Sequence, residues 1–222
     1  MPLLVQSVEP SLAEEYYLQL KYDLMVGSFD PGEKLSIRAL SERTGLGAAP
    51  IREALKRLAS ERILESGVKR SFAVPDLDDK RIVDLINLRA LLECHAAQQA
   101  LGASTRKDID QLGTLANRMQ RQISNLDHSG YMRSNHRFHF LIYSRSGNQD
   151  LVSMIEQLWA QTGPSLYRGL TNSDPTSDTH DSHGDIVAAL KSRNVEKLSS
   201  HMLSDINWAA THYGNTRPKT QS

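Results

Sequence analysis

Cysteine and long apolar runs are almost missing from this sequence of 222 residues. A single cysteine, Cys94, cannot form an intramolecular bridge, which excludes a disulfide scaffold. No window approaches the roughly 18 uninterrupted apolar residues of a membrane span, and the amino-terminal stretch lacks the basic start and small-residue cleavage site of a signal peptide. We therefore expect a cytoplasmic protein without membrane contact.

A net charge of one sign is also missing. Lysine plus arginine number 26 and aspartate plus glutamate number 26, so the whole-chain balance says nothing about a polyanionic partner. Stretches that alternate between apolar and polar residues are scarce, whereas apolar residues recur at helical spacing along most of the chain. The length suits one large domain or two smaller ones, and the pattern predicts a mainly α-helical protein.

The amino-terminal third has the pattern of a winged helix-turn-helix. Ser11 and Glu14 have the spacing of a capping box and begin a helix that stops near Gly27. Two short apolar-periodic stretches follow, one over 37–46 and one that begins at Pro50, with a glycine-containing turn between them. The run ESGVKRSFAV then places turn-like and basic residues between two small apolar runs, which predicts a β-hairpin, the wing.

A short segment with Pro75 and several aspartates interrupts every pattern, and we place the domain boundary there. Beyond it, six amphipathic helices are predicted, which would pack as an antiparallel bundle. They cover 80–100, 109–126, 131–143, 151–167, 183–190 and 195–210. The expected organisation is a winged helix-turn-helix domain over 1–75, an all-helical domain over 76–213 and a disordered tail over 214–222.

Basic residues gather in the winged helix-turn-helix. From Lys34 to Pro75 the chain has nine basic and four acidic residues, a local excess that the rest of the chain hides. Such a module fits double-stranded DNA, with its second helix in the major groove and its cationic side chains beside phosphates. A charge cluster alone is more often a solvated surface. Helix-turn-helix spacing combined with a basic wing tip favours DNA.

The same region resembles the winged helix-turn-helix of GntR-type bacterial transcription regulators. The resemblance rests on PGEKLSIRALSERTGLGAAPIREALKRLASERIL and the wing VKRSFAV, and its most specific parts are PGEKL and PIREALKRL. The second domain resembles the all-helical FCD-type effector domain of the FadR-like branch, through LRALLE in its first helix and FHFLIYSRSGN in its third. The resemblance implies a ligand-responsive regulator, by default a repressor, that binds operator DNA as a homodimer and transmits its signal across the Pro75 linker.

The resemblance also implies where DNA is contacted. An arginine in the first helix of the motif, an arginine that opens the REAL run and basic residues at the wing tip match family contacts. Where the family usually has Ser-Arg-Thr before the proline, this chain has Gly47, Ala48 and Ala49, which lack the helix cap and the base-reading guanidinium. We expect altered or weaker sequence selectivity with phosphate binding kept. The expected DNA-binding residues are Arg38, Ala48, Ala49, Arg52, Lys56, Lys69 and Arg70.

Polar residues at helical spacing in the second domain suggest a metal site. Asn135 and His139 are four residues apart, so both project from one face of the third predicted bundle helix. His183 opens another helix. His201 and Asp205 are again four apart, on the last helix. Imidazoles and oxygen ligands that converge inside a bundle suit a divalent transition metal, but a polar histidine in the core is commoner, and spacing alone leaves both interpretations open.

The resemblance to the FCD-type domain implies a specific ligand set. Many relatives bind a metal through an Asp or Asn, a His four residues later, a His at the start of the penultimate helix and a His in the last helix. The first three positions match Asn135, His139 and His183. The fourth falls on Asp205, with His201 as the alternative. We expect zinc first, because it suits two or three imidazoles, with nickel and manganese as alternatives.

Arg89, in LRALLE, matches a family arginine that often faces the effector pocket. A guanidinium suits a small carboxylate, and an open position on a metal binds a second oxygen. The expected effector is therefore a small organic acid. A salt bridge from Arg89 to Glu93, four residues on, is an equally good interpretation. The expected effector-binding residues are Arg89, Asn135, His139 and His183.

Two other functions fit parts of this pattern. Histidines and an oxygen ligand around an open coordination position also describe a metal-dependent enzyme of unknown substrate. No general base at fixed spacing, such as the glutamate of an HExxH helix, accompanies them, so we expect no enzyme. The other alternative is an architectural DNA binder with a degenerate sensor domain, to which Asn135 and Asp205 give some weight.

Overall fold

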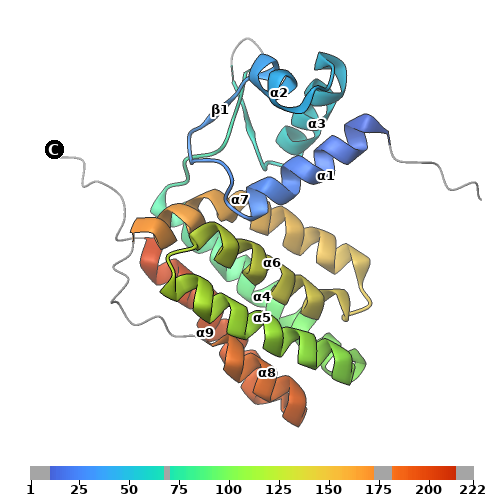
Figure 1. Ribbon diagram of the computed structural model, residues 1–222, viewed down its shortest axis with the longest axis vertical. Helices are drawn as coiled ribbons and strands as arrows, with labels where there is room; N and C mark the ends of the chain where they lie inside the picture. The colour runs from blue at the N-terminus through green and yellow to red at the C-terminus, as the bar shows by residue number, and fades with distance from the viewer. Residues whose placement is uncertain (1–10, 68–70, 173–181, 214–222) are drawn as a thin grey trace, which may run out of the picture.

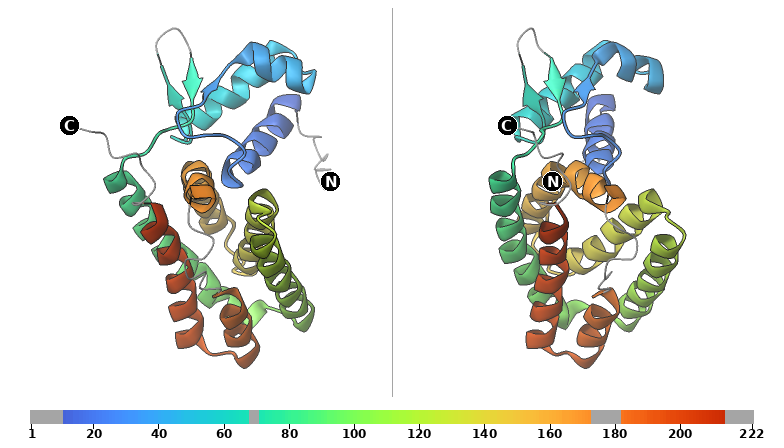
Figure 2. Two further views of the ribbon diagram at one scale, coloured as in Figure 1. Left: turned by 60° about the vertical axis from the view of Figure 1, so that its left-hand side comes forward. Right: turned by 90° about the vertical axis from the view of Figure 1, so that its left-hand side faces the viewer.

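The computed structural model describes residues 11–67, 71–172 and 182–213, with only the backbone of 209–213. Helices make up most of these residues, as the periodicity predicts (Figure 1). A winged helix-turn-helix, here called the head (α1 to β3), lies at one end of the molecule, and the helical bundle (α4 to α9) at the other (Figure 2). None of the described helices is long and apolar enough to cross a membrane.

The elements of the head follow the predicted order, and side-chain caps begin the first two helices. The hydroxyl of Ser11 accepts a hydrogen bond from the Glu14 amide at 3.2 Å, and that of Ser36 accepts one from the Ala39 amide at 3.4 Å. The predicted winged helix-turn-helix is thus confirmed. Its elements are α1 (Leu12–Met25), β1 (Lys34–Leu35), α2 (Ile37–Thr44), α3 (Ala48–Ser60), β2 (Glu65–Ser66) and β3 (Phe72–Ala73).

The turn between α2 and α3 differs from the prediction in one detail. α2 ends at Gly45, whose φ of 72° lies in the left-handed region that glycine adopts without a Cβ clash. α3 begins at Ala48 and not at Pro50. The residue before it, Gly47, has no side chain that could accept a hydrogen bond from the first amides of the helix. Proline is tolerated at the third helical position because the first-turn amides have no partner within the helix.

The wing is part of a three-stranded antiparallel sheet with the order β1-β3-β2. Ala73 pairs with Lys34 on one side and with Glu65 on the other. The hairpin of β2 and β3 is the predicted wing. Strand β1 was not predicted, because two residues are too few to show an alternating pattern. The expected contacts Lys69 and Arg70, at the wing tip, lie outside the described residues.

All six predicted helices of the bundle are present, with somewhat shifted ends. α4 packs against α7 and α9, and α5 packs against α6 and α8. Figure 2 shows α4 and α9 side by side along one flank of the bundle. The helices are α4 (Asp79–Ala103), α5 (Arg106–Ser124), α6 (His128–Ser144), α7 (Gln149–Asn172), α8 (His183–Ser192) and α9 (Val195–Tyr213).

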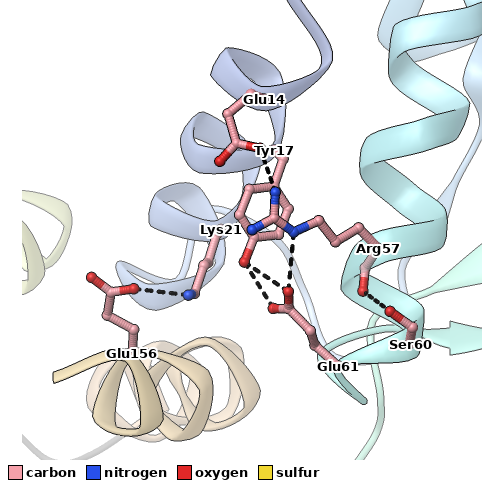
Figure 3. Close-up of polar contacts among 7 residues, drawn as sticks. All are labelled: Glu14, Tyr17, Lys21, Arg57, Ser60, Glu61 and Glu156. Carbon is pink, nitrogen blue, oxygen red and sulfur yellow. Dashed lines mark hydrogen bonds and ion pairs between the residues drawn. The ribbon is translucent and has the colours of Figure 1, made fainter. Parts of the chain in front are cut away.

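Helix α1 belongs to the head but also packs on the bundle, because it contacts both α3 and α7. Its Leu20 and Leu24 are fully buried in an apolar cluster that continues into the bundle as far as Trp159. Lys21 is only 5% exposed although it is charged, and its Nζ forms an ion pair at 2.8 Å with Glu156 of α7 (Figure 3). One buried cluster therefore joins the head to the bundle.

Gly163 of α7 allows the two parts to approach closely. A Cβ on Gly163 would lie 2.6 Å from the carbonyl oxygen of Met25 and closer still to that of Leu24, at the carboxyl end of α1. Real Cβ atoms do not approach backbone atoms this closely, so the observed separation requires glycine. The α1–α7 contact holds the head on the bundle in addition to the chain connection at Pro75.

Candidate functional site: a DNA-contact surface and a metal centre

The exposed face of α3 carries most of the expected DNA-contact residues. Ala48, Ala49, Arg52 and Lys56 are all exposed, at helical spacing on one side of α3. Arg52 and Lys56 also line a groove between α3 and the wing. Arg38, on α2, has a side chain that is 90% exposed and forms an ion pair with Glu42 at 2.9 Å. Arg52 and Lys56 are therefore the two basic side chains of α3 that face solvent beside the wing.

Arg57, another basic residue of α3, does not lie on this face. Its guanidinium lies over the ring of Tyr17 at 3.6 Å from the ring centre and forms ion pairs with Glu14 and Glu61. The hydroxyl of Tyr17 donates to Glu61 at 2.8 Å (Figure 3). Arg57 therefore joins α3 to α1, a role that local charge counting misses because it does not show which way a side chain points.

Three ionisable side chains from three helices meet inside the bundle. They are His139 of α6, His183 of α8 and Asp205 of α9, whose potential ligand atoms all lie within 4.8 Å of one another. Nε2 of His139 is 3.1 Å from one carboxylate oxygen of Asp205, and Nε2 of His183 is 3.6 Å from the other. Both imidazoles are buried, and the side chain of Asp205 is 17% exposed.

Asn135 completes this cluster, and His201 does not. The side-chain oxygen of Asn135 lies 2.9 Å from Nε2 of His183. His201, the alternative to Asp205, instead lies near Asp185, with its Nδ1 at 3.9 Å from a carboxylate oxygen of that residue. Of the two candidates on the last helix, Asp205 is therefore the one placed among the other three residues.

The electrostatics of Asp205 favour its charged form. Burial by itself would raise the pKa of this carboxyl, but the neighbouring His183 and the hydrogen bonds from His139 and Ser182 lower it well below its usual range. The hydroxyl of Ser182 donates to Asp205 at 2.7 Å. The result is a carboxylate that is held ionised beside two imidazoles.

The donor set fits a divalent metal ion. Four-coordinate zinc, with bonds of about 2.0–2.1 Å, places its ligand atoms about 3.3–3.4 Å apart. The two imidazole nitrogens lie 3.1 and 3.6 Å from Asp205, each measured to a different carboxylate oxygen, and 2.9 Å separates Nε2 of His183 from the Asn135 oxygen. Two imidazole nitrogens, a carboxylate and an amide oxygen are ligands that zinc, nickel and manganese all accept.

Arg89 forms the salt bridge that was one of its two expected roles. Its Nε donates to Oε1 of Glu93 at 2.6 Å, and its guanidinium lies 4.4 Å from the centre of the Trp159 ring. Arg89 also lines a small cavity of about 50 Å³ together with Asn135 and His139. The salt bridge does not remove it from the cavity wall.

A larger cavity of about 560 Å³ adjoins the small one. The two share Tyr131, Leu170, Asp205 and Trp208 in their walls. A volume of this size lies in the range of small-molecule sites. Asp205 thus belongs to the cluster with Asn135, His139 and His183, here called the metal-type cluster, and also lines a space of the size that holds a small ligand.

Sequence reasoning missed the residues that support the cluster. Tyr143 lies four residues after His139 and hydrogen-bonds to its Nδ1 at 3.1 Å, and the same hydroxyl contacts Glu93 at 2.5 Å. Trp159 donates to Glu93 at 2.9 Å. The helical spacing from His139 to Tyr143 was a usable signal, but nothing in the sequence showed that Glu93 and Trp159 would meet them.

Two known families match this chain. The family described as "Bacterial regulatory proteins, gntR family" matches residues 12–74, and the FCD domain matches residues 84–207. The chain belongs to the GntR family. The FCD match includes His139, His183 and Asp205, so the metal-type cluster of this GntR-family protein lies inside its FCD domain.

Curated relatives and a solved structure agree with this assignment. The HTH-type transcriptional regulator McbR of Escherichia coli (strain K12) is 31% identical over 199 residues, 88% of this chain and 89% of McbR. The HTH-type transcriptional repressor GlaR of the same strain is 26% identical over 202 residues, 86% of this chain and 92% of GlaR. The structure of E. coli McbR/YncC matches with a TM-score of 0.85 at 29% identity, over 93% of this chain and 99% of that one. This GntR-family protein is a transcriptional regulator.

Proposed function

We propose that this regulator is a ligand-responsive homodimer, by default a repressor. Its head, over residues 1–75, binds operator DNA, and its bundle, over residues 76–213, binds a small organic acid and a divalent metal, zinc first. The observation that carries the proposal is the meeting of two imidazoles, a carboxylate and an amide oxygen beside a cavity that Arg89 also lines.

The DNA side of the proposal rests on the exposed face of α3. Arg52 and Lys56 are the cationic side chains that can displace counterions from phosphates. Ala48 and Ala49, at the amino-terminal end of α3, offer no hydrogen-bond donor to base edges. The head therefore binds duplex DNA with a large phosphate component and little base discrimination from the start of α3. A homodimer presents two such heads to a pseudo-palindrome.

On the ligand side, Asn135, His139, His183 and Asp205 hold the metal. When bound, the metal supplies a positive charge with an open position for an oxygen of the effector. Arg89 supplies a guanidinium on the wall of the small cavity, which has room for little more than a carboxylate at about 50 Å³. The adjoining cavity of about 560 Å³ takes the remainder of the acid.

Helix α7 is the element that connects ligand and DNA. Its Trp159 and Thr162 contact Glu93 and Arg89 at the ligand side, with Arg89 donating to the Thr162 hydroxyl at 3.3 Å. Its Gly163 is packed against the end of α1, and α1 contacts α3. A displacement of α7 by an effector therefore reaches the DNA-contact helix through α1. This route adds to the Pro75 linker expected from the sequence.

The DNA side is tested with a duplex that the protein selects from a random library. We expect Arg52→Ala to weaken binding of that duplex several-fold and to reduce the slope of log affinity against log salt by about one. Arg118→Ala, an exposed arginine on the bundle, is the matched control and should leave both unchanged. Equal binding by the two variants would remove Arg52 from the interface.

The metal side is tested by thermal shift of chelator-stripped protein with added zinc. We expect zinc to stabilise the wild type, and Asp205→Asn to remove that stabilisation. Asp185→Asn is the matched control, because Asp185 lies beside His201 and outside the cluster. A panel of small organic acids on the zinc-loaded protein then identifies the effector class. Turnover of any acid would favour the enzyme alternative, and no shift with metal or acid would favour the architectural DNA binder.

A further inference from the structure

A buried carboxylate next to the cluster collects hydrogen bonds from three directions. Glu93 of α4 is fully buried. Its Oε1 accepts from Nε of Arg89 at 2.6 Å and from the indole of Trp159 at 2.9 Å. Its Oε2 lies 2.5 Å from the hydroxyl of Tyr143. Because guanidinium and indole nitrogens can only donate, Oε1 of Glu93 accepts both bonds, and its ion pair with Arg89 leaves Oε2 to accept from Tyr143.

The acceptor role of Glu93 sets the direction of the hydrogen bond between Tyr143 and His139. Tyr143 has one hydroxyl proton, and its oxygen lies closer to Glu93, at 2.5 Å, than to His139. That proton points to Glu93. The Tyr143 oxygen must then accept the hydrogen bond from Nδ1 of His139, 3.1 Å away. His139 therefore carries a proton on Nδ1, and Nε2 is the nitrogen that it can offer to a metal ion.

Nε2 is the nitrogen that faces the cluster. It lies 3.1 Å from the carboxylate of Asp205, to which it donates the hydrogen bond described above. A divalent cation between the two atoms would take the place of that proton. A second buried group that orients a metal-ligating histidine is a general feature of metal sites, and its removal typically costs 10–100-fold in metal affinity.

We propose that Tyr143 and Glu93 are positioning residues of the metal centre: the chain Glu93–Tyr143–His139 fixes the imidazole in the tautomer that presents Nε2 to a divalent cation. The proposal rests on the metal site of the proposed function. It also gives the Arg89 salt bridge a second role, because Arg89 holds the carboxylate that orients Tyr143.

Two variants act on the chain in different ways. Tyr143→Phe removes the hydroxyl and leaves His139 without a partner at Nδ1, so we expect a 10–100-fold loss of zinc affinity. Glu93→Gln can donate to the Tyr143 oxygen through its amide, which turns the hydroxyl proton toward Nδ1 and favours a proton on Nε2. We therefore expect a larger loss for Glu93→Gln than for Tyr143→Phe. Tyr16→Phe, a buried tyrosine of α1, is the matched control with unchanged zinc affinity.

Zinc affinity is measured by competition with a chromophoric chelator on chelator-stripped protein, together with the melting temperature of each variant. The second readout is the histidine tautomer, observed by long-range ¹H–¹⁵N NMR of zinc-free protein at about pH 9, where an ordinary imidazole is neutral. We expect Nδ1 of His139 to be protonated throughout in the wild type and only partly protonated in Tyr143→Phe.

The zinc affinities and the His139 tautomer decide whether Tyr143 and Glu93 position the imidazole. Zinc affinity within two-fold of wild type in a folded Tyr143→Phe variant, or a wild-type His139 without a proton on Nδ1, would overturn the proposal. If Glu93→Gln fails to fold, Tyr143→Phe and the tautomer still decide. If the wild type binds no zinc, the metal part of the proposed function fails and the positioning role fails with it, whereas zinc binding that is indifferent to Tyr143 removes the positioning role alone.

Discussion

Replacing Gly163 with alanine tests the contact that joins head and bundle. The added Cβ would lie 2.6 Å from the Met25 carbonyl oxygen and closer to that of Leu24, whereas real Cβ atoms stay at least 3.0 Å from such atoms. Backbone atoms on both sides cannot rotate away as a side chain can. α1 and α7 must therefore separate by roughly 0.5–1 Å along a surface that is otherwise close-packed.

Two opposing effects set the size of the stability change. Alanine favours the helical state of α7 over glycine by about 0.5–1 kcal/mol. Overpacking at a rigid contact costs about 1–3 kcal/mol, which outweighs the gain in helix propensity. We expect Gly163→Ala to lower the free energy of unfolding by about 1–2 kcal/mol. Gly113→Ala, in α5 with nothing within 4 Å of its added Cβ, should raise it by about 0.5–1 kcal/mol.

The assay is urea unfolding of both variants, followed by amide hydrogen exchange. The change in urea midpoint at constant m gives the stability difference. Faster exchange confined to α1 and α3 in Gly163→Ala, with α5 and α8 as in wild type, would show that the head has loosened on the bundle. Gly163→Ala as stable as Gly113→Ala, with exchange in α1 unchanged, would refute the close contact and the route through α7.

The remaining predictions concern the buried charges and rings near that contact. Both ring nitrogens of His136 are buried without a hydrogen-bond partner among the described residues, and burial lowers its pKa to about 4, below the ordinary value of 6.5. The unfolded chain therefore takes up the proton first, and stability falls by up to about 3 kcal/mol as the pH drops from 6.5 toward 4. His136→Phe should raise the urea midpoint, more at pH 5 than at pH 7.5, and an equal shift at both would contradict this. Glu156→Gln leaves the buried Lys21 without its ion-pair partner and should cost about 1–3 kcal/mol in urea unfolding, less than a fully buried pair because the Glu156 side chain is 29% exposed. Asp84→Asn, which breaks the exposed Lys80–Asp84 pair, should leave the midpoint unchanged, and equal effects would mean that burial of Lys21 is unimportant.

The helices were predictable because their apolar spacing and caps are local. Ser11 caps α1 as its spacing to Glu14 indicates. Each helix of the bundle spans the stretch of periodic apolar residues that predicted it. The start of α3 was predicted two residues late, because Pro50 marks the first turn of a helix without fixing its first residue. Strand β1 depends on pairing with a segment nearly forty residues away, which local pattern cannot show.

The candidate site was predictable only in part. Asn135 and His139 share one helix, so their common face follows from spacing. Their meeting with His183 and Asp205 depends on how α6, α8 and α9 pack, and the grouping of these four residues into one ligand set came from a family resemblance. The support of His139 by Tyr143 and Glu93, and the docking of α1 on α7, are tertiary contacts between segments that carry no shared local signal.

The most direct test of ligand-responsive DNA binding is the affinity for the selected duplex with zinc, with zinc plus each organic acid, and with neither. We predict that at least one acid changes the duplex affinity by about five-fold or more, and that the duplex changes the affinity for that acid by the same factor. A duplex affinity that neither zinc nor any acid alters, or two factors that differ, would contradict a sensor bundle coupled to a DNA-binding head.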